Sequence, residues 1–276
     1  MEFRINPTAG LANRLRALGC ALWVADLMDR DIVLSWLKYS GMAADFSDLF
    51  KDQFDCSKRE GWKTYGAGNR VARDLYIDIE SEGRIEISTC GVFSYKGGPK
   101  VWSDGMWAEV SPYIRSLSPV DEIQDVVAEF YEKNDIGNKV GIHIRRTDNA
   151  NSKKYSKLEH FYAEMDKTDK DFFLCSDCEK TKRVVSERYA GRCVSFKHPY
   201  KVCPNTRETI RGVKRGFCEL LLLGKTIKIV GSVFSSFGTM ASVIEGAPIK
   251  RVGDKGVFSQ KIFVDKEYKT WDGSGI

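Results

Sequence analysis

Apolar and polar positions follow a regular pattern in the second half of the chain, from about residue 120 onward. Short apolar runs typical of buried strands alternate with longer segments in which apolar residues recur every three to four positions, as on one face of a helix. This alternation predicts parallel β-α-β units with helices on both faces of a sheet. The expected strands are 140–144, 172–175, 193–196, 226–230 and 249–252, and the expected helices are 120–133, 179–191, 206–223 and 237–245.

The first half of the chain begins with a similar pattern and then loses it. A strand over residues 2–6 leads through a glycine-containing loop into a helix over 11–25, and another strand is expected at 32–36. Residues 38–118 are less regular, with many glycines and aromatic residues, and we assign no topology to them.

The pattern and the length together predict an α/β protein with two Rossmann-type domains that face each other across a cleft. The 276 residues are enough for each domain to bury a core of its own. We place the boundary where the regular pattern begins, which gives an N-terminal domain of residues 1–120 and a C-terminal domain of residues 121–276. The C-terminal domain is the one that we expect to bind the main ligand.

Charge and composition narrow the range of partners. The 43 Lys and Arg exceed the 38 Asp and Glu, and the net charge of +5 is dispersed along the chain. This balance favours anionic ligands and argues against a nucleic-acid-binding protein. No apolar run approaches the ~18 residues that span a bilayer, and the N-terminus lacks a signal-peptide pattern. We therefore expect a cytoplasmic protein without a transmembrane segment.

The cysteines show no arrangement typical of disulfides or of a metal site. Cys175 and Cys178 have the spacing of half a zinc site, but no second close pair exists among the eight cysteines, and the three histidines are scattered. We therefore expect reduced cysteines and no bound metal.

The strongest candidate for a functional site follows the expected strand at 140–144. This apolar run leads directly into Arg145 and Arg146, with Asp148 close behind. Strand ends are where α/β proteins hold ligands, and a guanidinium group offers a fork of donors that suits a phosphate. A buried structural pair of arginines would need two nearby carboxylates, and the segment has one. We predict a diphosphate clamp; the alternative is a surface salt-bridge patch.

Two further segments offer groups for binding an anion. Gly10 and Asn13 lie at the start of the expected helix 11–25, where backbone N–H groups attract anions, although a simple helix cap is equally consistent with them. A serine-rich loop at 232–236 follows a strand and opens a helix, which is also suited to an anion.

Several of these segments, taken in order, resemble the motifs of a known superfamily. The α1,2-, α1,6- and protein O-fucosyltransferases have similar motifs in the same order and rough spacing. The resemblance covers the motif positions and most of residues 138–247, and residues 38–118 contribute nothing to it. The segments are Gly10-Leu-Ala-Asn13-Arg14, His143-Ile-Arg145-Arg146-Thr-Asp148, Phe173-Leu-Cys-Ser-Asp177, and Glu219-Leu-Leu-Leu-Leu-Gly224 leading into Gly231-Ser-Val-Phe-Ser235-Ser236-Phe-Gly.

The resemblance implies an inverting, metal-independent glycosyltransferase of the GT-B architecture. Such an enzyme transfers L-fucose from GDP-fucose to a hydroxyl of a glycan or glycoprotein and needs no cofactor. Arg145 becomes the main phosphate ligand and stabiliser of the leaving group, and Arg146 assists it. Glu219 stands where the family usually has an aspartate that reads guanine. The implied donor-binding residues are Gly10, His143, Arg145, Arg146, Asp177, Glu219, Ser232, Phe234, Ser235 and Ser236, and the implied catalytic residues are Arg145, Asp148 and Asn13.

The sequence departs from the family at the catalytic base. Some members use a glutamate shortly after the arginine motif, whereas residues 149–154 contain no carboxylate. Asp148, Asp177, Glu159 and acids of the first half remain candidates, and the alternation of the strand favours a structural role for His143. Glu219 could also be an ordinary helix residue. The alternative functions are the same fold with another nucleotide sugar, such as UDP-xylose, and a non-catalytic sugar- or nucleotide-binding protein.

Overall fold

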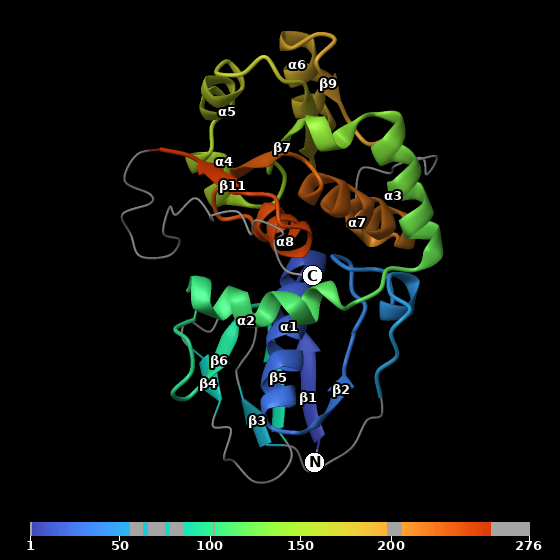
Figure 1. Cartoon of the computed structure of the whole chain (residues 1–276), viewed down its shortest axis with the longest axis vertical. Coiled ribbons are helices and arrows are strands. Elements are labelled where there is room, and N and C mark those ends of the chain that lie inside the picture. Colours follow the sequence, from blue (N-terminus) through green and yellow to red (C-terminus); the bar gives the residue numbers. More distant parts are fainter. Residues whose placement is uncertain are drawn as a thin grey trace. The chain divides into compact units, whose positions relative to one another are not determined.

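The chain folds into two compact units, each with its own parallel sheet (Figure 1). One unit contains Met1–Ile123 and Tyr200–Phe217, and the other contains Gln124–Pro199 and Cys218–Ile276. The computed structural model describes residues 2–55, 63–65, 75–77, 85–101, 103–197 and 206–254.

The second unit is built on a five-stranded parallel sheet with the order β11-β10-β7-β8-β9. The chain runs from β7 to β8 and β9 on one side and then returns to β10 and β11 on the other. In chain order this is the 3-2-1-4-5 arrangement of doubly wound sheets, in which the connections diverge between the first and fourth strands, here β7 and β10. The strands are β7 Val140–Ile144, β8 Phe172–Ser176, β9 Cys193–Val194, β10 Lys228–Ser232 and β11 Ile249–Val252.

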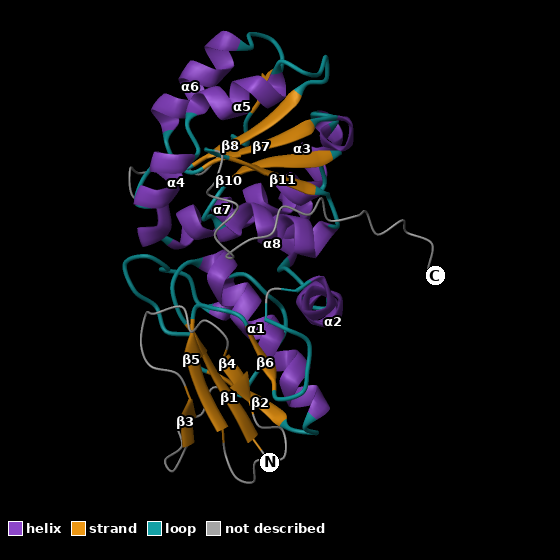
Figure 2. Cartoon of the chain, turned by 90° about the vertical axis from the view of Figure 1, so that its left-hand side faces the viewer, coloured by secondary structure: helices purple, strands orange, loops and turns teal. Residues whose placement is uncertain are grey.

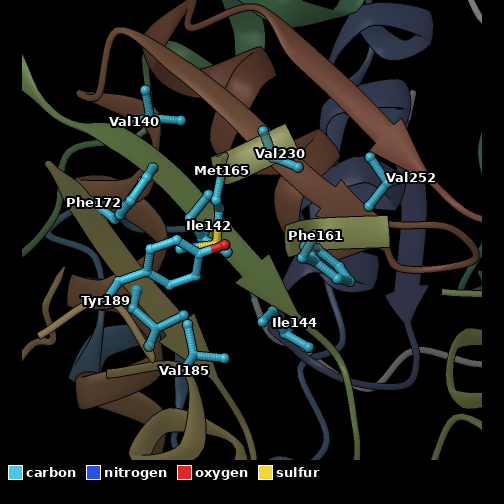
Figure 3. Packing of buried hydrophobic residues seen from close by; sticks show 11 residues of the cluster. Val140, Ile142, Ile144, Phe161, Met165, Phe172, Val185, Tyr189, Val230 and Val252 are labelled. Carbon is cyan, nitrogen blue, oxygen red and sulfur yellow. The ribbon is translucent and has the colours of Figure 1, made fainter. Parts of the chain in front are cut away.

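Helices cover both faces of this sheet (Figure 2). Residues of β7 and β8 with even numbers, such as Ile142 and Phe172, pack in one apolar cluster with Phe161, Met165 and Val185 (Figure 3). These three partners come from α5 and α6, which therefore cover this face. The helices of the unit are α4 Ala150–Tyr155, α5 Leu158–Met165, α6 Glu179–Arg188 and α8 Ser236–Glu245, with parts of α3 Asp121–Lys133 and α7 Ile210–Gly224.

The opposite face of the sheet packs against α3, α7 and α8. Phe173 contacts Phe130 of α3, with 6.1 Å between the ring centroids, and the His143 ring stacks on Phe237 of α8 at 4.9 Å. A Cβ added at Gly141 would lie 2.7 Å from the side chain of Leu223, so glycine allows α7 to approach β7 closely. Odd-numbered positions of β7 and β8 therefore face these helices.

The first unit has a four-stranded parallel sheet with the order β2-β1-β5-β3, and a separate parallel pair of β4 and β6. A Cβ added at Gly19 of α1 would lie 2.3 Å from the side chain of Ile114 of α2, so these two helices pack closely. The elements are β1 Glu2–Pro7, α1 Leu11–Leu27, β2 Asp31–Leu34, β3 Lys63–Tyr65, β4 Leu75–Ile77, β5 Ile85–Thr89, β6 Phe93–Tyr95 and α2 Asp104–Arg115.

The predicted mixed α/β fold with parallel sheets is confirmed, and the differences are local. The helix expected to begin at residue 206 starts with a separate 3-10 turn, Thr206–Glu208. The strand expected at 226–230 begins at Lys228, because the hydroxyl of Thr226 donates to the Leu223 carbonyl at the end of α7, at 2.7 Å. No helix in the described part of the chain is long and apolar enough to cross a membrane.

Candidate functional site

Arg145 lies directly beyond β7 and is bound by two carboxylates. Its guanidinium forms an ion pair with Asp148 and a second with Asp177, where Nη1 is 3.1 Å from Oδ2. Asp177 follows β8 and is adjacent to Arg145 because Ile144 and Ser176 are paired in register. The sequence predicted a single carboxylate near the arginines, and this is wrong. Asp177 could not be foreseen, because the sequence does not show which strand ends are neighbours. The protein itself neutralises the charge of Arg145.

The carboxylate of Asp177 also fixes the loop that follows β7. Its Oδ1 accepts a hydrogen bond from the backbone N–H of Arg146 at 2.7 Å, and its Oδ2 accepts one from the N–H of Thr147 at 3.2 Å. The hydroxyl of Thr147 donates to the same oxygen. With these donors and Arg145, Asp177 is saturated with partners and holds the loop in position.

The guanidinium groups of Arg145 and Arg146 have different partners. The Arg146 guanidinium donates to the backbone carbonyl of Ser156 at 2.5 Å, in the loop that follows α4. Its partial burial lowers the pKa of the Arg146 side chain, while the nearby Asp177 opposes that shift. Arg146 therefore holds the loop in place, and Arg145 carries the cationic group next to the exposed carboxylate of Asp148.

Ser232, at the end of β10, holds the end of β7. Its buried hydroxyl accepts from the backbone N–H of Arg145 at 3.0 Å and lies 3.4 Å from the carbonyl oxygen of His143, to which it donates. The structure thus places Ser232 beside Arg145, but its hydroxyl is engaged with the backbone. Ser232 therefore fixes the position of the Arg145 backbone.

Two more serines join the loops that follow β7, β10 and β11. The hydroxyl of Ser152 donates to the carbonyl of Val233 at 2.6 Å. The hydroxyl of Ser156 donates to the carbonyl of Val252 at 2.6 Å and accepts from the N–H of Val233 at 2.9 Å. Sequence reasoning did not single out either serine, because their partners lie about 80 to 100 residues away.

The loop after β10 presents the start of α8 at the same edge of the sheet. Phe234 has a left-handed backbone with φ of 57°, which is strained for a residue other than glycine. Asn149 holds this conformation by donating to the Phe234 carbonyl at 2.7 Å. Ser235 is the N-cap residue but its side chain makes no capping hydrogen bond, and Ser236 is the first helical residue. Hydroxyl and backbone N–H groups therefore gather at this helix end, which suits an anion.

His143 is buried beneath Arg145 and is neutral at physiological pH. Burial, with a smaller contribution from the charge of Arg145, lowers the pKa of His143 to about 4. Its ring stacks on Phe237, and its Nδ1 has no hydrogen-bond partner among the described residues. This environment agrees with the structural role that the strand alternation favours.

Glu219 lies on α7 and forms a buried ion pair with Lys182 of α6. Glu219 Oε1 is 3.2 Å from Lys182 Nζ, and the side chains are 12% and 8% exposed. The thiol of Cys175, on β8, is 3.8 Å from the Glu219 carbonyl oxygen. Glu219 is thus beside the last residues of β8. The sequence contains no local signal for Lys182, because α6 and α7 are distant along the chain.

Gly10 and Asn13 belong to the first unit, at the start of α1. Gly10 is the N-cap residue and makes no side-chain cap, and Asn13 is half-buried. A Cβ added at Gly10 would lie 3.8 Å from a guanidinium nitrogen of Arg207. Ala9 has a left-handed backbone with φ of 64°, and its carbonyl accepts from Arg14 at 2.9 Å. The neighbours named here, Ala9, Arg14 and Arg207, all belong to the first unit.

The described residues contain no metal centre and no disulfide. No group of three or more His, Cys, Asp or Glu side chains in the described ranges could hold a metal ion. The six cysteines in those ranges form no disulfide, and Cys178 is the N-cap residue of α6.

Comparison with known proteins gives structural relatives only. No family model and no curated protein matches the sequence. The α1,6-fucosyltransferase NodZ from Bradyrhizobium, in a crystal soaked with GDP-fucose, superposes with a TM-score of 0.61 at 15% identity, over 90% of this chain and 93% of that one. The chain has the fold of the fucosyltransferases.

Two other fucosyltransferase structures support the same fold. POFUT1 in complex with GDP gives a TM-score of 0.57 at 11% identity, over 92% of this chain and 99% of that one. FUT1 of Arabidopsis thaliana with GDP gives 0.58 at 15% identity, over 91% of this chain and 69% of that one. The resemblance inferred from the motifs is thereby confirmed for the fold. At these identities the fucosyltransferase fold is shared, and the reaction has to be argued from the site.

Proposed function

We propose that this protein is an inverting, metal-independent glycosyltransferase that moves L-fucose from GDP-fucose to a hydroxyl group of a glycan or glycoprotein. The observation that carries the proposal is the position of Arg145. It lies where the connections of the second sheet diverge, between β7 and β10, and doubly wound sheets bind their ligands at this point. The start of α8 at the same edge adds backbone donors.

In this proposal the diphosphate of the donor takes the place of Asp148 on Arg145. The side chain of Asp148 is 51% exposed, whereas that of Asp177 is 19% exposed and bound by the loop. Asp148 is therefore the partner that can be exchanged, and Asp177 keeps the guanidinium oriented. Guanidinium groups form similar bidentate pairs with carboxylates and phosphates, so the exchange conserves the hydrogen bonds of Arg145.

The reaction requires stabilisation of the leaving diphosphate. An acceptor hydroxyl attacks the anomeric carbon opposite the departing group, and negative charge grows on the diphosphate as the bond breaks. Arg145 is preorganised by Asp177 and by Ser232, and supplies the positive charge at that point. We assign the neighbouring start of α8, with Ser235 and Ser236, to the phosphates as well.

Asp148 is the residue that we propose as the base. When the diphosphate occupies Arg145, the exposed carboxylate of Asp148 at the edge of the site accepts the proton of the acceptor hydroxyl. Asp177 is saturated with donors, and the low pKa of His143 makes that side chain a poor base. For the first unit, with Gly10 and Asn13, we propose the acceptor side of the two-domain GT-B arrangement.

The decisive test is Arg145→Ala in a transfer assay with GDP-fucose. Loss of a preorganised donor to the leaving group should reduce turnover by about 10²- to 10³-fold, while the circular dichroism spectrum stays that of a folded protein. Arg188→Ala is the matched control, because Arg188 is a paired arginine on the exposed side of α6, and it should keep normal turnover. A folded Arg145→Ala protein with normal turnover would contradict the proposal.

A thermal-shift panel separates the remaining functions. We expect GDP to stabilise the protein without a divalent cation, by about 2.7 kcal/mol at a hundredfold excess over Kd. Stabilisation by UDP alone would indicate that the donor is another nucleotide sugar and not GDP-fucose. Binding of GDP-fucose without transfer or hydrolysis would indicate a non-catalytic binding protein.

A further inference from the structure

We propose that Lys182 is a specificity-determining residue for guanine, beside Glu219, which the resemblance already assigns to the base. The inference rests on the proposed function, because it concerns the donor of the same site. It goes further in assigning a second residue to the base, one that the motifs of the sequence do not contain.

The pair occupies the appropriate place in the fold. His143 and Cys175 are paired in register on β7 and β8, and two positions later these strands lead to Arg145 and Asp177. Cys175 Sγ lies 3.8 Å from the carbonyl oxygen of Glu219. The Lys182–Glu219 pair therefore stands beside the same two strands whose ends carry the arginine that we assign to the diphosphate. A base attached to that diphosphate can extend along this edge.

Burial makes the pair costly as a purely structural feature. Both side chains are at least 88% buried, and Glu219 is followed by four leucines, Leu220 to Leu223, that pack in the interior. Replacing a buried ion pair by apolar residues often leaves a protein equally or more stable, because desolvation offsets the attraction between the charges. A charged pair at this place is better explained by a ligand that uses it.

The chemistry of the pair matches one base in particular. An ammonium group has three N–H donors, and those of Lys182 meet Glu219 at 3.2 Å and Glu179 at 3.3 Å, which leaves capacity for a third acceptor. The Watson–Crick edge of guanine presents the O6 acceptor beside the N1–H and N2–H donors. Lys182 can donate to O6 while the Glu219 carboxylate accepts from N1–H and N2–H. Adenine presents the N6–H donor and the N1 acceptor at the positions of O6 and N1–H. The Lys182 ammonium would then face a donor, and the Glu219 carboxylate would face an acceptor.

The experiment is a calorimetric titration of the full chain with GDP, IDP, ADP, UDP and inorganic pyrophosphate. For the wild type we expect GDP to bind tightest, IDP more weakly because it lacks the 2-amino group, and ADP weakest. Lys182→Met should weaken GDP by about 10- to 100-fold, the equivalent of one hydrogen bond to a charged group, and leave pyrophosphate unchanged. Glu219→Gln should reduce the preference for GDP over both IDP and ADP.

Glu179→Gln is the matched control, because Glu179 also pairs with Lys182 but its side chain is 73% exposed. This variant should keep the GDP-to-ADP ratio of the wild type. If Lys182→Met does not fold, the double variant Lys182→Gln with Glu219→Gln replaces the charges by two amides that can bond to each other, and it should fold and lose the preference for GDP.

The outcomes distinguish the inference from the proposed function. Equal weakening of all nucleotides, or an unchanged GDP-to-ADP ratio in the Lys182 and Glu219 variants, would show that the pair is structural and would overturn the inference alone. A wild type that binds neither GDP nor any other nucleoside diphosphate would overturn the proposed function as well.

Discussion

The two units hold an arginine beside a strand end or helix start in different ways. In the second unit Arg145 is bound by side-chain carboxylates, one of which is exposed. In the first unit Arg14 is almost fully buried on α1, donates to the backbone carbonyls of Ala9 and Leu37 at 2.9 and 2.6 Å, and lies 4.7 Å from the centre of the Trp36 ring. Backbone carbonyls cannot leave without unfolding the loops, whereas a side-chain carboxylate can. Arg14 is therefore a structural cation, whereas the partner that we propose to be exchangeable belongs to Arg145.

The largest effect that would separate the two arginines is on stability. Arg14→Met removes both hydrogen bonds of an almost fully buried guanidinium, and we expect the free energy of unfolding to fall by about 3 kcal/mol. Arg145→Ala should cost less, about 1 kcal/mol, because Asp148 is exposed and Asp177 keeps its hydrogen bonds to the backbone of Arg146 and Thr147. Urea denaturation of both variants measures this difference. Equal losses would erase the distinction between a structural and an exchangeable arginine.

The next effect concerns the pKa values of two buried basic side chains, Arg14 in the first unit and His143 in the second. Burial lowers the pKa of Arg14 to about 10, so it stays charged, but it lowers the pKa of His143 to about 4, so it loses its proton. The unfolded chain binds a proton at His143 near pH 6.5, and the folded protein does not. Stability should therefore decrease as the pH falls from 6.5 towards 4, by up to about 1.4 kcal/mol per pH unit from this group.

Denaturation series at several pH values measure this slope, with His143→Leu as the test variant. The apolar replacement should flatten the part of the profile between pH 6.5 and 4. His160→Gln is the control, because His160 is only partly buried and pairs with Asp254, and it should retain the slope. An unchanged slope in His143→Leu would mean that His143 is not the group responsible.

The smallest effect tests the exchange of Asp148 directly. Asp148→Asn removes the carboxylate that we propose to compete with the diphosphate for Arg145, and GDP should bind about two- to fivefold more tightly, in line with a partly exposed ion pair. Transfer should slow at the same time, because Asp148 is the proposed base. Calorimetry measures the expected gain in GDP affinity, and the transfer assay measures the expected loss of turnover. Weaker GDP binding would show that Asp148 orients Arg145 instead of competing with its ligand.

The sequence predicted the frame of the second unit better than the contacts within its site. The boundaries of β7 and β11 agree with the apolar runs, because buried parallel strands are marked by continuous apolar residues. The short helices α4 and α5 were not predicted, since a few residues between two strands carry little periodicity. The partners of Arg145 and Glu219 depend on which strand ends and helices are neighbours. Asp177 and Lys182 become visible only when the strand order and register are known.

The serine hydroxyls between the loops have a consequence for ligand affinity. Ser152 and Ser156 tie the segment after β7 to the ends of β10 and β11, and a serine side chain has only one rotatable bond before its oxygen. The conformational entropy of this edge is therefore lost when the chain folds and not when a ligand arrives. A preorganised edge of this kind lowers the ordering cost that a ligand, such as the proposed diphosphate, pays on binding.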